Sequence, residues 1–251
     1  MRGAAAGGLD VIALADHDTA AGFDAANAVG REVNVQVIPA LEVSSTYRGR
    51  DVHVLGYFVD PGSEAILEHS ARATRRREDR MREMIERLRA AGVDVSYGAV
   101  EDAAGPDRVV IGRPHLAKAL VAAGYVGSVP EAFDSLIGDD APAFVPTQLL
   151  GPKDAVEVIL AGGGIPMWAH PPGDLVDDLL PELLRSGLRG LEVYRPRNAK
   201  ADVLRLEGLC RSGELLVSGG SDWHSPDGRT VLGDFFVTAE EVEDLLTEGG
   251  L

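Results

Sequence analysis

The sequence has one cysteine and no long apolar run. Because Cys210 is the single cysteine among 251 residues, an intramolecular disulfide is excluded and a reducing compartment is compatible with the chain. No apolar stretch approaches the roughly 20 residues of a membrane-spanning helix, and no signal peptide precedes the first expected strand. We therefore expect a cytoplasmic protein without a membrane partner.

Positive charge is also scarce. The chain carries 24 Lys and Arg against 40 Asp and Glu, a formal net charge of −16. This balance disfavours a broad surface for duplex DNA, whose phosphates attract many cations. Basic residues nevertheless gather in residues 72–89, which hold eight arginines. A local cationic patch on an acidic protein suits a small, highly charged ligand or the end of a nucleic-acid strand.

The sequence lacks a Gly-x-x-x-x-Gly-Lys phosphate-binding loop and a serine or cysteine nucleophile motif. Its composition, 45% hydrophobic and 25% charged, is that of a globular protein large enough for one core. Strand and helix patterns alternate, which predicts the α/β class. We expect strands at 9–15, 35–43, 50–58, 165–169, 188–194 and 215–218. We expect helices at 20–30, 63–92, 113–123, 129–136, 152–161, 175–186, 199–212 and 240–246.

Carboxylate and imidazole side chains follow or interrupt several of these strands. Asp16, His17 and Asp18 follow the apolar run 11–15, which we predict to be a strand buried on both faces. Taken alone, this tripeptide fits a helix cap at Asp18 or Thr19 equally well. The pattern recurs, however, at Glu42, His53, His170, Asp222 and His224. Because ligands gather at the carboxyl ends of strands in such sheets, the recurrence predicts a multinuclear metal site.

In order along the chain, these motifs resemble those of the polymerase and histidinol phosphatase (PHP) phosphoesterases. The resemblance runs from about Leu9 to Phe236. It rests on Ala-Asp16-His17-Asp-Thr, Glu42-Val-Ser, Val-His53-Val-Leu-Gly-Tyr, Gly-Arg-Pro-His115, Ala-His170-Pro and Gly-Ser-Asp222-Trp-His224. The Gly-Arg-Pro-His motif and the arginine-rich segment before it are similar to one branch, the 3′,5′-nucleoside bisphosphate phosphatases and RNA 5′-end exonucleases.

The resemblance implies an α/β fold of the PHP type, a distorted (β/α)7 barrel formed by residues 1–62 and 146–251. Residues 63–145 would be a helical insertion that contributes to the substrate site. The family opens with a strand carrying His-x-His and a nearby aspartate, which this chain lacks. We therefore expect a barrel without its first strand, through either a start placed too late or a true loss.

The resemblance also assigns roles to residues. Glu42 would bridge two metal ions, with His53 and His170 completing one position and Asp222 serving the other. His17 and His224 would serve a third position, and Asp16 would be a further ligand or an orienting carboxylate in catalysis beside His17. Phosphate contacts would come from Arg76, Arg77, Arg80, Arg113 and His115.

The implied function is hydrolysis of a phosphate monoester of a small nucleotide by a metal-activated hydroxide. Two or three divalent ions are expected, with Mn favoured and Mg, Zn or Fe compatible with the ligand chemistry. One alternative is an RNA or DNA 5′-end exonuclease or a histidinol-phosphate-type phosphatase. The other is a truncated, inactive domain that binds phosphorylated ligands or a protein.

Overall fold

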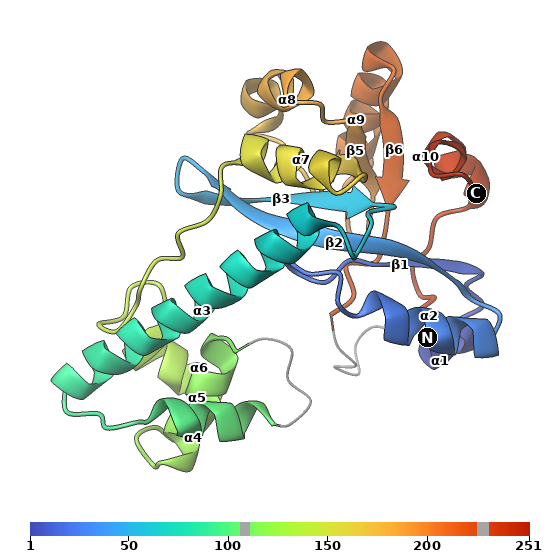
Figure 1. The fold of residues 1–251 in the computed structure, drawn as a ribbon. Helices are drawn as coiled ribbons and strands as arrows, with labels where there is room; N and C mark the ends of the chain where they lie inside the picture. The colour runs from blue at the N-terminus through green and yellow to red at the C-terminus, as the bar shows by residue number, and fades with distance from the viewer. Residues whose placement is uncertain (106–110, 225–230) are drawn as a thin grey trace. The chain divides into compact units, whose positions relative to one another are not determined.

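The computed structural model describes residues 1–105, 111–224 and 231–251 (Figure 1). The chain divides into two compact units. The first combines Met1–Ser70 with Leu149–Leu251, and the second is Ala71–Gln148. Helix α3, Glu64–Ala90, begins in the first unit and continues into the second.

The first unit is built on a six-stranded mixed sheet with the strand order β1-β2-β3-β4-β5-β6. β3 is antiparallel to both of its neighbours, whereas β1 with β2 and β4 with β5 and β6 form parallel pairs. Five strands therefore run in one direction and β3 runs against them. Their bounds are β1 Val11–Leu14, β2 Gln36–Tyr47, β3 Arg50–Tyr57, β4 Ile165–Trp168, β5 Gly190–Tyr194 and β6 Leu216–Gly219.

The expected α/β class is confirmed, because this mixed half-barrel sheet with its helices fits an α/β barrel. The described residues contain six strands, so the sevenfold count and the missing first strand stay predictions. The expectation that the run at 11–15 is buried on both faces is wrong. β1 is an edge strand, Val11 is 39% exposed, and the other three residues of the strand are only partly buried.

The reversal of β3 has a local cause in the turn between β2 and β3. The turn residues Arg48 and Gly49 have φ angles of 50° and 78°. Positive φ at both central positions is the signature of a type I′ turn, whose twist matches an antiparallel hairpin. The resulting ladder pairs Tyr47 with Arg50 and continues to Ala40 opposite Tyr57.

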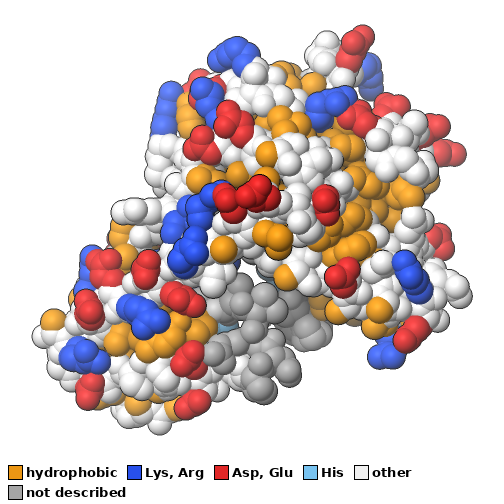
Figure 2. All heavy atoms as spheres, in the orientation of Figure 1, with side chains coloured by type: hydrophobic (Ala, Val, Ile, Leu, Met, Phe, Trp, Pro, Cys, Tyr) orange, Lys and Arg blue, Asp and Glu red, His pale blue; other side chains and the backbone are white. Residues whose placement is uncertain are grey.

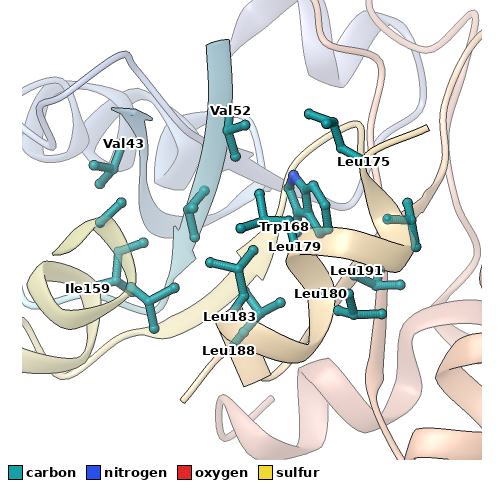
Figure 3. Packing of buried hydrophobic residues seen from close by; sticks show 14 of the residues in the cluster. Val43, Val52, Ile159, Trp168, Leu175, Leu179, Leu180, Leu183, Leu188 and Leu191 are labelled. Atoms are coloured by element: carbon teal, nitrogen blue, oxygen red, sulfur yellow. The ribbon is translucent and has the colours of Figure 1, made fainter. Parts of the chain in front are cut away.

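The two faces of the sheet follow the period-2 alternation of strand side chains. On one face, Leu41, Val43, Val52 and Val54 join a core cluster with Trp168 and helices α7 and α8. Figure 3 shows Val43, Val52 and Trp168 of this cluster together with Ile159 of α7 and Leu179 and Leu183 of α8. On the other face, a second cluster contains alternate residues of the same strands, including Ile38, Ala40, Leu55, Tyr57 and Met167. We call this second side the inner face.

The helices of the first unit lie close to their predicted positions. α7 packs against β2, β3 and β4, and α9 packs against β5 and β6 (Figure 1). The predicted helix at 20–30 begins three residues later, after Gly22, and neither Asp18 nor Thr19 is its N-cap residue. The bounds are α1 Arg2–Ala6, α2 Phe23–Glu32, α7 Pro152–Ala161, α8 Val176–Arg185, α9 Lys200–Gly213, a 3₁₀ turn Ala239–Val242 and α10 Glu243–Glu248.

The second unit is helical and has its own core. Met81, Met84, Ile85 and Leu88 of α3 pack with α5 and neighbouring segments, as the apolar stripe on this helix predicts. The sequence patterns did not predict α4, which starts after Ser96; the Ser96 side chain accepts a hydrogen bond from the Ala99 N–H. The bounds are α4 Tyr97–Ala104, α5 Arg113–Ala122, α6 Val129–Ala132 and a π-helical turn Phe133–Ile137. Across the described residues, no helix is both long and apolar enough to cross a membrane.

Replacement of Leu179 by alanine tests whether the cluster in Figure 3 is the core of the first unit. Leu179 is 0% exposed, and truncation of such a leucine costs about 2–5 kcal/mol. The matched control is Leu204→Ala on α9, where the side chain is 57% exposed and the expected change is within about 0.5 kcal/mol. Urea unfolding measures both. Equal losses for the two variants would contradict the assignment.

Candidate metal centre

The candidate ligands share the inner face because of their parity along the strands. Glu42 and Ser44 follow Ile38 and Ala40 at two-residue steps on β2, and His53 precedes Leu55 and Tyr57 on β3. Alternate side chains of a strand point to the same face. Glu42, Ser44 and His53 therefore lie beside the apolar cluster on the inner face.

The strand directions bring these residues to one end of the sheet. His17, His170 and Asp222 follow the carboxyl ends of β1, β4 and β6, as expected from the sequence. Glu42 does not end its strand, which corrects that part of the prediction, whereas His53 lies inside its strand as predicted. Glu42 lies inside the twelve-residue β2, and His53 is the fourth residue of β3. Because β3 runs against the others, its first half reaches the end where the parallel strands finish.

Two imidazole nitrogens converge on one oxygen of the Glu42 carboxylate. One oxygen, Oε1, lies 2.8 Å from His53 Nδ1 and 3.2 Å from His170 Nε2. The two imidazole nitrogens are 3.1 Å apart. Two nitrogen ligands at 2.0–2.1 Å from one tetrahedral metal ion would be separated by about 3.3 Å. The distance between the two nitrogens is close to this value, whereas Oε1 and His53 Nδ1 are at hydrogen-bond distance.

The other carboxylate oxygen of Glu42 faces His17. Its Oε2 lies 3.8 Å from His17 Nδ1, which also lies 3.3 Å from Ser44 Oγ. His17, Glu42 and His53 each offer a ligand atom, and these atoms all lie within 4.8 Å of one another. Glu42 thus has an imidazole nitrogen near each of its two oxygens.

Asp222 and His224 form the more exposed side of the centre. The ring centroids of His224 and His17 are 5.7 Å apart, and His224 Nδ1 lies 3.5 Å from Asp222 Oδ1. The side chain of His224 is 60% exposed and that of Asp222 is 49% exposed, whereas that of Glu42 is 8% exposed. The centre therefore has a buried carboxylate and a solvent-accessible side.

Three residues at or beside the centre have left-handed backbone conformations. The φ angles of Asp18, His170 and Asp222 are 59°, 32° and 50°. This region is uncommon for residues other than glycine, and a strained residue costs on the order of 1–3 kcal/mol. Each of the three follows the carboxyl end of a strand, where the turned backbone redirects the chain. Such strain is typical of functional sites.

The electrostatics of the centre depend on the burial of Glu42. Burial alone would raise the pKa of Glu42, but hydrogen bonds to His170 and His53 and the nearby His17 lower it well below its usual range. Burial lowers the pKa of His17. Burial opposes the charge of His170 too, yet its contact with Glu42 leaves the pKa of His170 raised. The carboxylate is therefore ionised, and its charge attracts cations.

Glu192 on β5 is a second buried carboxyl group. Its Oε2 accepts a 2.7 Å hydrogen bond from the backbone N–H of His170, and the residue is 5% exposed. Desolvation raises the pKa of Glu192 from 4.5 to about 7. The sequence predicts a strand here, but Glu192 is not among the predicted site residues. Its position between Leu191 and Val193, which belong to the helix-covered core, could have indicated that Glu192 points to the inner face.

Asp16 and Asp18 differ in how deeply they are buried. Asp16 is exposed as a residue, yet partial desolvation of its carboxyl group raises its pKa. Its backbone carbonyl accepts a hydrogen bond from the Glu42 N–H. Asp18 is 2% exposed, and its Oδ1 accepts from Ser44 N–H at 2.9 Å and contacts His69 Nε2 at 3.1 Å. His69 was missed by sequence reasoning, although it lies on one buried stripe of α3 with Ile66 and Ala73.

The predicted phosphate-binding residues all belong to the second unit. Arg80 Nε donates to the Val145 carbonyl at 2.6 Å, and Arg113 pairs with Asp139 at 2.6 Å. The guanidinium groups of both lie over the ring of Phe144, at 5.7 and 5.6 Å from its centroid. His115 Nδ1 accepts from the Gly112 N–H at the start of α5. Arg76 and Arg77 are partly buried on α3.

Comparison with characterised proteins shows extensive similarity. The chain is 34% identical to phosphoribosyl 1,2-cyclic phosphate 1,2-diphosphodiesterase of Eggerthella lenta over 94% of this chain and 91% of that protein. It is 33% identical to a 5′-3′ exoribonuclease of Haemophilus influenzae over 90% and 83%. It is 29% identical to the 3′,5′-nucleoside bisphosphate phosphatase of Chromobacterium violaceum over 89% and 80%.

Solved structures agree with this similarity. A protein from Bifidobacterium adolescentis, assigned as a metal-dependent phosphoesterase, superimposes with a TM-score of 0.81 at 30% identity. The match covers 97% of this chain and 87% of that one. No family profile matches the chain.

Replacement of Glu192 by glutamine tests the state of this buried carboxyl group. A carboxyl whose pKa is higher in the folded state contributes stability fully below its unfolded value, 4.5, and loses it as pH rises through about 7. The shift corresponds to about 3 kcal/mol. Glu192→Gln removes this loss, so its stability relative to wild type should rise between pH 5 and pH 8.

Urea unfolding of the metal-free protein in EDTA at the two pH values measures the difference. Glu157→Gln is the matched control, because Glu157 is exposed on α7. A stability difference for Glu192→Gln that stays constant with pH would contradict the raised pKa.

Proposed function

Because the chain belongs to the PHP family of metal-dependent phosphoesterases, we propose that it hydrolyses a phosphate monoester of a small nucleotide of the 3′,5′-nucleoside bisphosphate type. The observation that carries this proposal is the convergence of His53 and His170 on one oxygen of Glu42, with His17 facing the other. Imidazole and carboxylate donors at these spacings suit divalent transition-metal ions.

We assign the ligands as follows. Glu42 would contribute to two metal positions, His53 and His170 would complete one of them, Asp222 would serve the second, and His17 with His224 would serve a third. When bound, the ions would polarise a phosphoryl oxygen and lower the pKa of the attacking water. Mn is our preferred identity, and Mg, Zn and Fe suit the same donors.

The chain's own residues provide charge and orientation. The ionised Glu42 attracts the cations, and Ser44 Oγ with its 3.3 Å contact to His17 Nδ1 orients that imidazole. A ligating histidine is commonly held by such a neighbouring group. Asp16, next to His17, is the remaining candidate for orienting the nucleophile. Arg76, Arg77, Arg80, Arg113 and His115 are our candidates for binding substrate phosphates, where their charge would offset that of the phosphoryl oxygens.

The charge distribution favours a small substrate. The net charge is −16, and Figure 2 shows acidic and basic side chains interspersed on the visible face. A long polyanion requires an extended basic surface, whereas a nucleoside bisphosphate requires only local cations. The similarity to an exoribonuclease of Haemophilus influenzae nevertheless makes trimming of an RNA 5′ end our second candidate.

Replacement of Glu42 by glutamine tests the proposed centre. The variant keeps the shape of the side chain but loses the charge that both metal positions require. We expect phosphate release from adenosine 3′,5′-bisphosphate with added Mn to fall at least about 100-fold, beyond the effect of disturbing an outer-shell partner. Glu157→Gln should retain wild-type activity. Unchanged activity of Glu42→Gln would exclude Glu42 from catalysis.

The same assay separates the substrate classes. Wild-type protein is incubated with adenosine 3′,5′-bisphosphate, a 5′-phosphorylated single-stranded RNA and a ribose 1,2-cyclic phosphate, each with Mn and with EDTA. Mn-dependent release only from the bisphosphate supports the main proposal. Preferential RNA trimming would favour the second candidate, and no turnover of any of the three would favour a binding domain.

Substitution of Arg76 and Arg77 together by alanine tests phosphate binding by α3. Each charged hydrogen bond to a phosphate is worth about 1.5–3 kcal/mol, so we expect KM to rise at least tenfold with a smaller change in kcat. Arg89→Ala is the control on the same helix, because Arg89 is exposed and pairs with Asp94. Michaelis curves that match between the double variant and the control would remove these arginines from the substrate site.

A further inference from the structure

A buried carboxylate–imidazole pair lies beside the candidate ligands but belongs to none of the assigned metal positions. Asp18 and His69 are 2% and 0% exposed, and His69 Nε2 lies 3.1 Å from Asp18 Oδ1. Both residues lie in the first unit. Burial of such a pair is costly unless its hydrogen bonds are made, so its position requires an explanation beyond packing.

Asp18 fastens the loop after β1 to β2. Its backbone N–H donates to the Glu42 carbonyl at 2.9 Å, and its Oδ1 accepts from the Ser44 N–H at 2.9 Å. Asp18 directly follows His17 and has a left-handed φ of 59°. These contacts hold the backbone next to His17 against β2, the strand that carries Glu42.

His69 reaches Asp18 from a different element. It lies on α3, where it shares a buried stripe with Ile66 and Ala73, which are 1% and 4% exposed. Its Nδ1 is buried and has no hydrogen-bond partner among the described residues. The contact with Asp18 is thus the polar interaction that the structure gives this ring, and the Nε2 hydrogen is the one donated. An apolar side chain would suit the stripe better if packing alone mattered.

We propose that His69 is a positioning residue of the metal centre, which holds Asp18 in place and through it orients His17 against Glu42. The chain of contacts is continuous: His69 Nε2 to Asp18 Oδ1, Asp18 N–H to the Glu42 carbonyl, and Ser44 between Asp18 and His17. The proposal rests on the metal-binding function proposed above. His69 does not touch the substrate or the metal ions.

The experiment compares Mn affinity in four variants of the full chain by isothermal titration calorimetry. His69→Gln retains an amide N–H near the position of Nε2, whereas His69→Asn is one methylene shorter and does not reach Asp18. His69→Phe fills the space without a donor. Ile66→Val, on the same stripe, disturbs packing without touching Asp18. Thermal unfolding of each metal-free variant gives the structural effect separately.

We expect His69→Asn and His69→Phe to weaken Mn binding about 10- to 100-fold, the range typical for partners that hold a metal ligand. His69→Gln should stay within about threefold of wild type. Ile66→Val should lower the unfolding temperature but leave the affinity unchanged. If His69→Phe does not fold, the comparison of the asparagine and glutamine variants, which both bury an amide, decides the question.

Two results would overturn the positioning role. One is an unchanged affinity in His69→Asn and His69→Phe with a loss of thermal stability only, which is a packing effect. The other is an equal loss of affinity in His69→Gln and His69→Asn, because the reach of the donor would then be irrelevant. If wild-type protein binds no Mn, the proposed function fails first and His69 has no centre to position.

Discussion

The structure depends on one buried carboxylate. Glu42 is 6% exposed, and an isolated charge at such a position would be strongly destabilising. Imidazoles from three other segments compensate it: His17 after β1, His53 on β3 and His170 after β4. Their contacts more than reverse the effect of desolvation on the pKa of Glu42. Divalent ions would also neutralise this carboxylate. The imidazoles that compensate its charge are therefore also the residues suited to binding metal ions.

Strand direction and parity make that compensation possible. Because β3 runs against its neighbours, a histidine in its first half meets residues that follow the parallel strands. Parity then separates the apolar side chains of the helix-covered core from the polar group on the inner face. Left-handed residues at Asp18, His170 and Asp222 redirect the backbone where the chain leaves β1, β4 and β6. The polar residues on the inner face are therefore held by a sheet that is otherwise stabilised by ordinary packing.

Similarity to proteins with different activities separates scaffold from specificity. The relatives from Eggerthella lenta and Haemophilus influenzae are named for different phosphoester substrates, yet both match most of this chain at 34% and 33% identity. A common fold does not by itself imply a common substrate. Substrate choice therefore has to be sought in individual side chains and not in the shared fold.

The sequence by itself determined the α/β alternation, the bounds of helices such as α7, and the residue types that gather in the centre, because periodicity and strand-end chemistry are local. It also pointed to Glu42, His53 and His170 before any contact was known. Only the tertiary structure decided the reversal of β3, the edge position of β1 and the pairing of His69 with Asp18, 51 residues apart. These features arise from contacts between distant segments, whose free energy depends on what packs together and not on neighbouring residues in the chain.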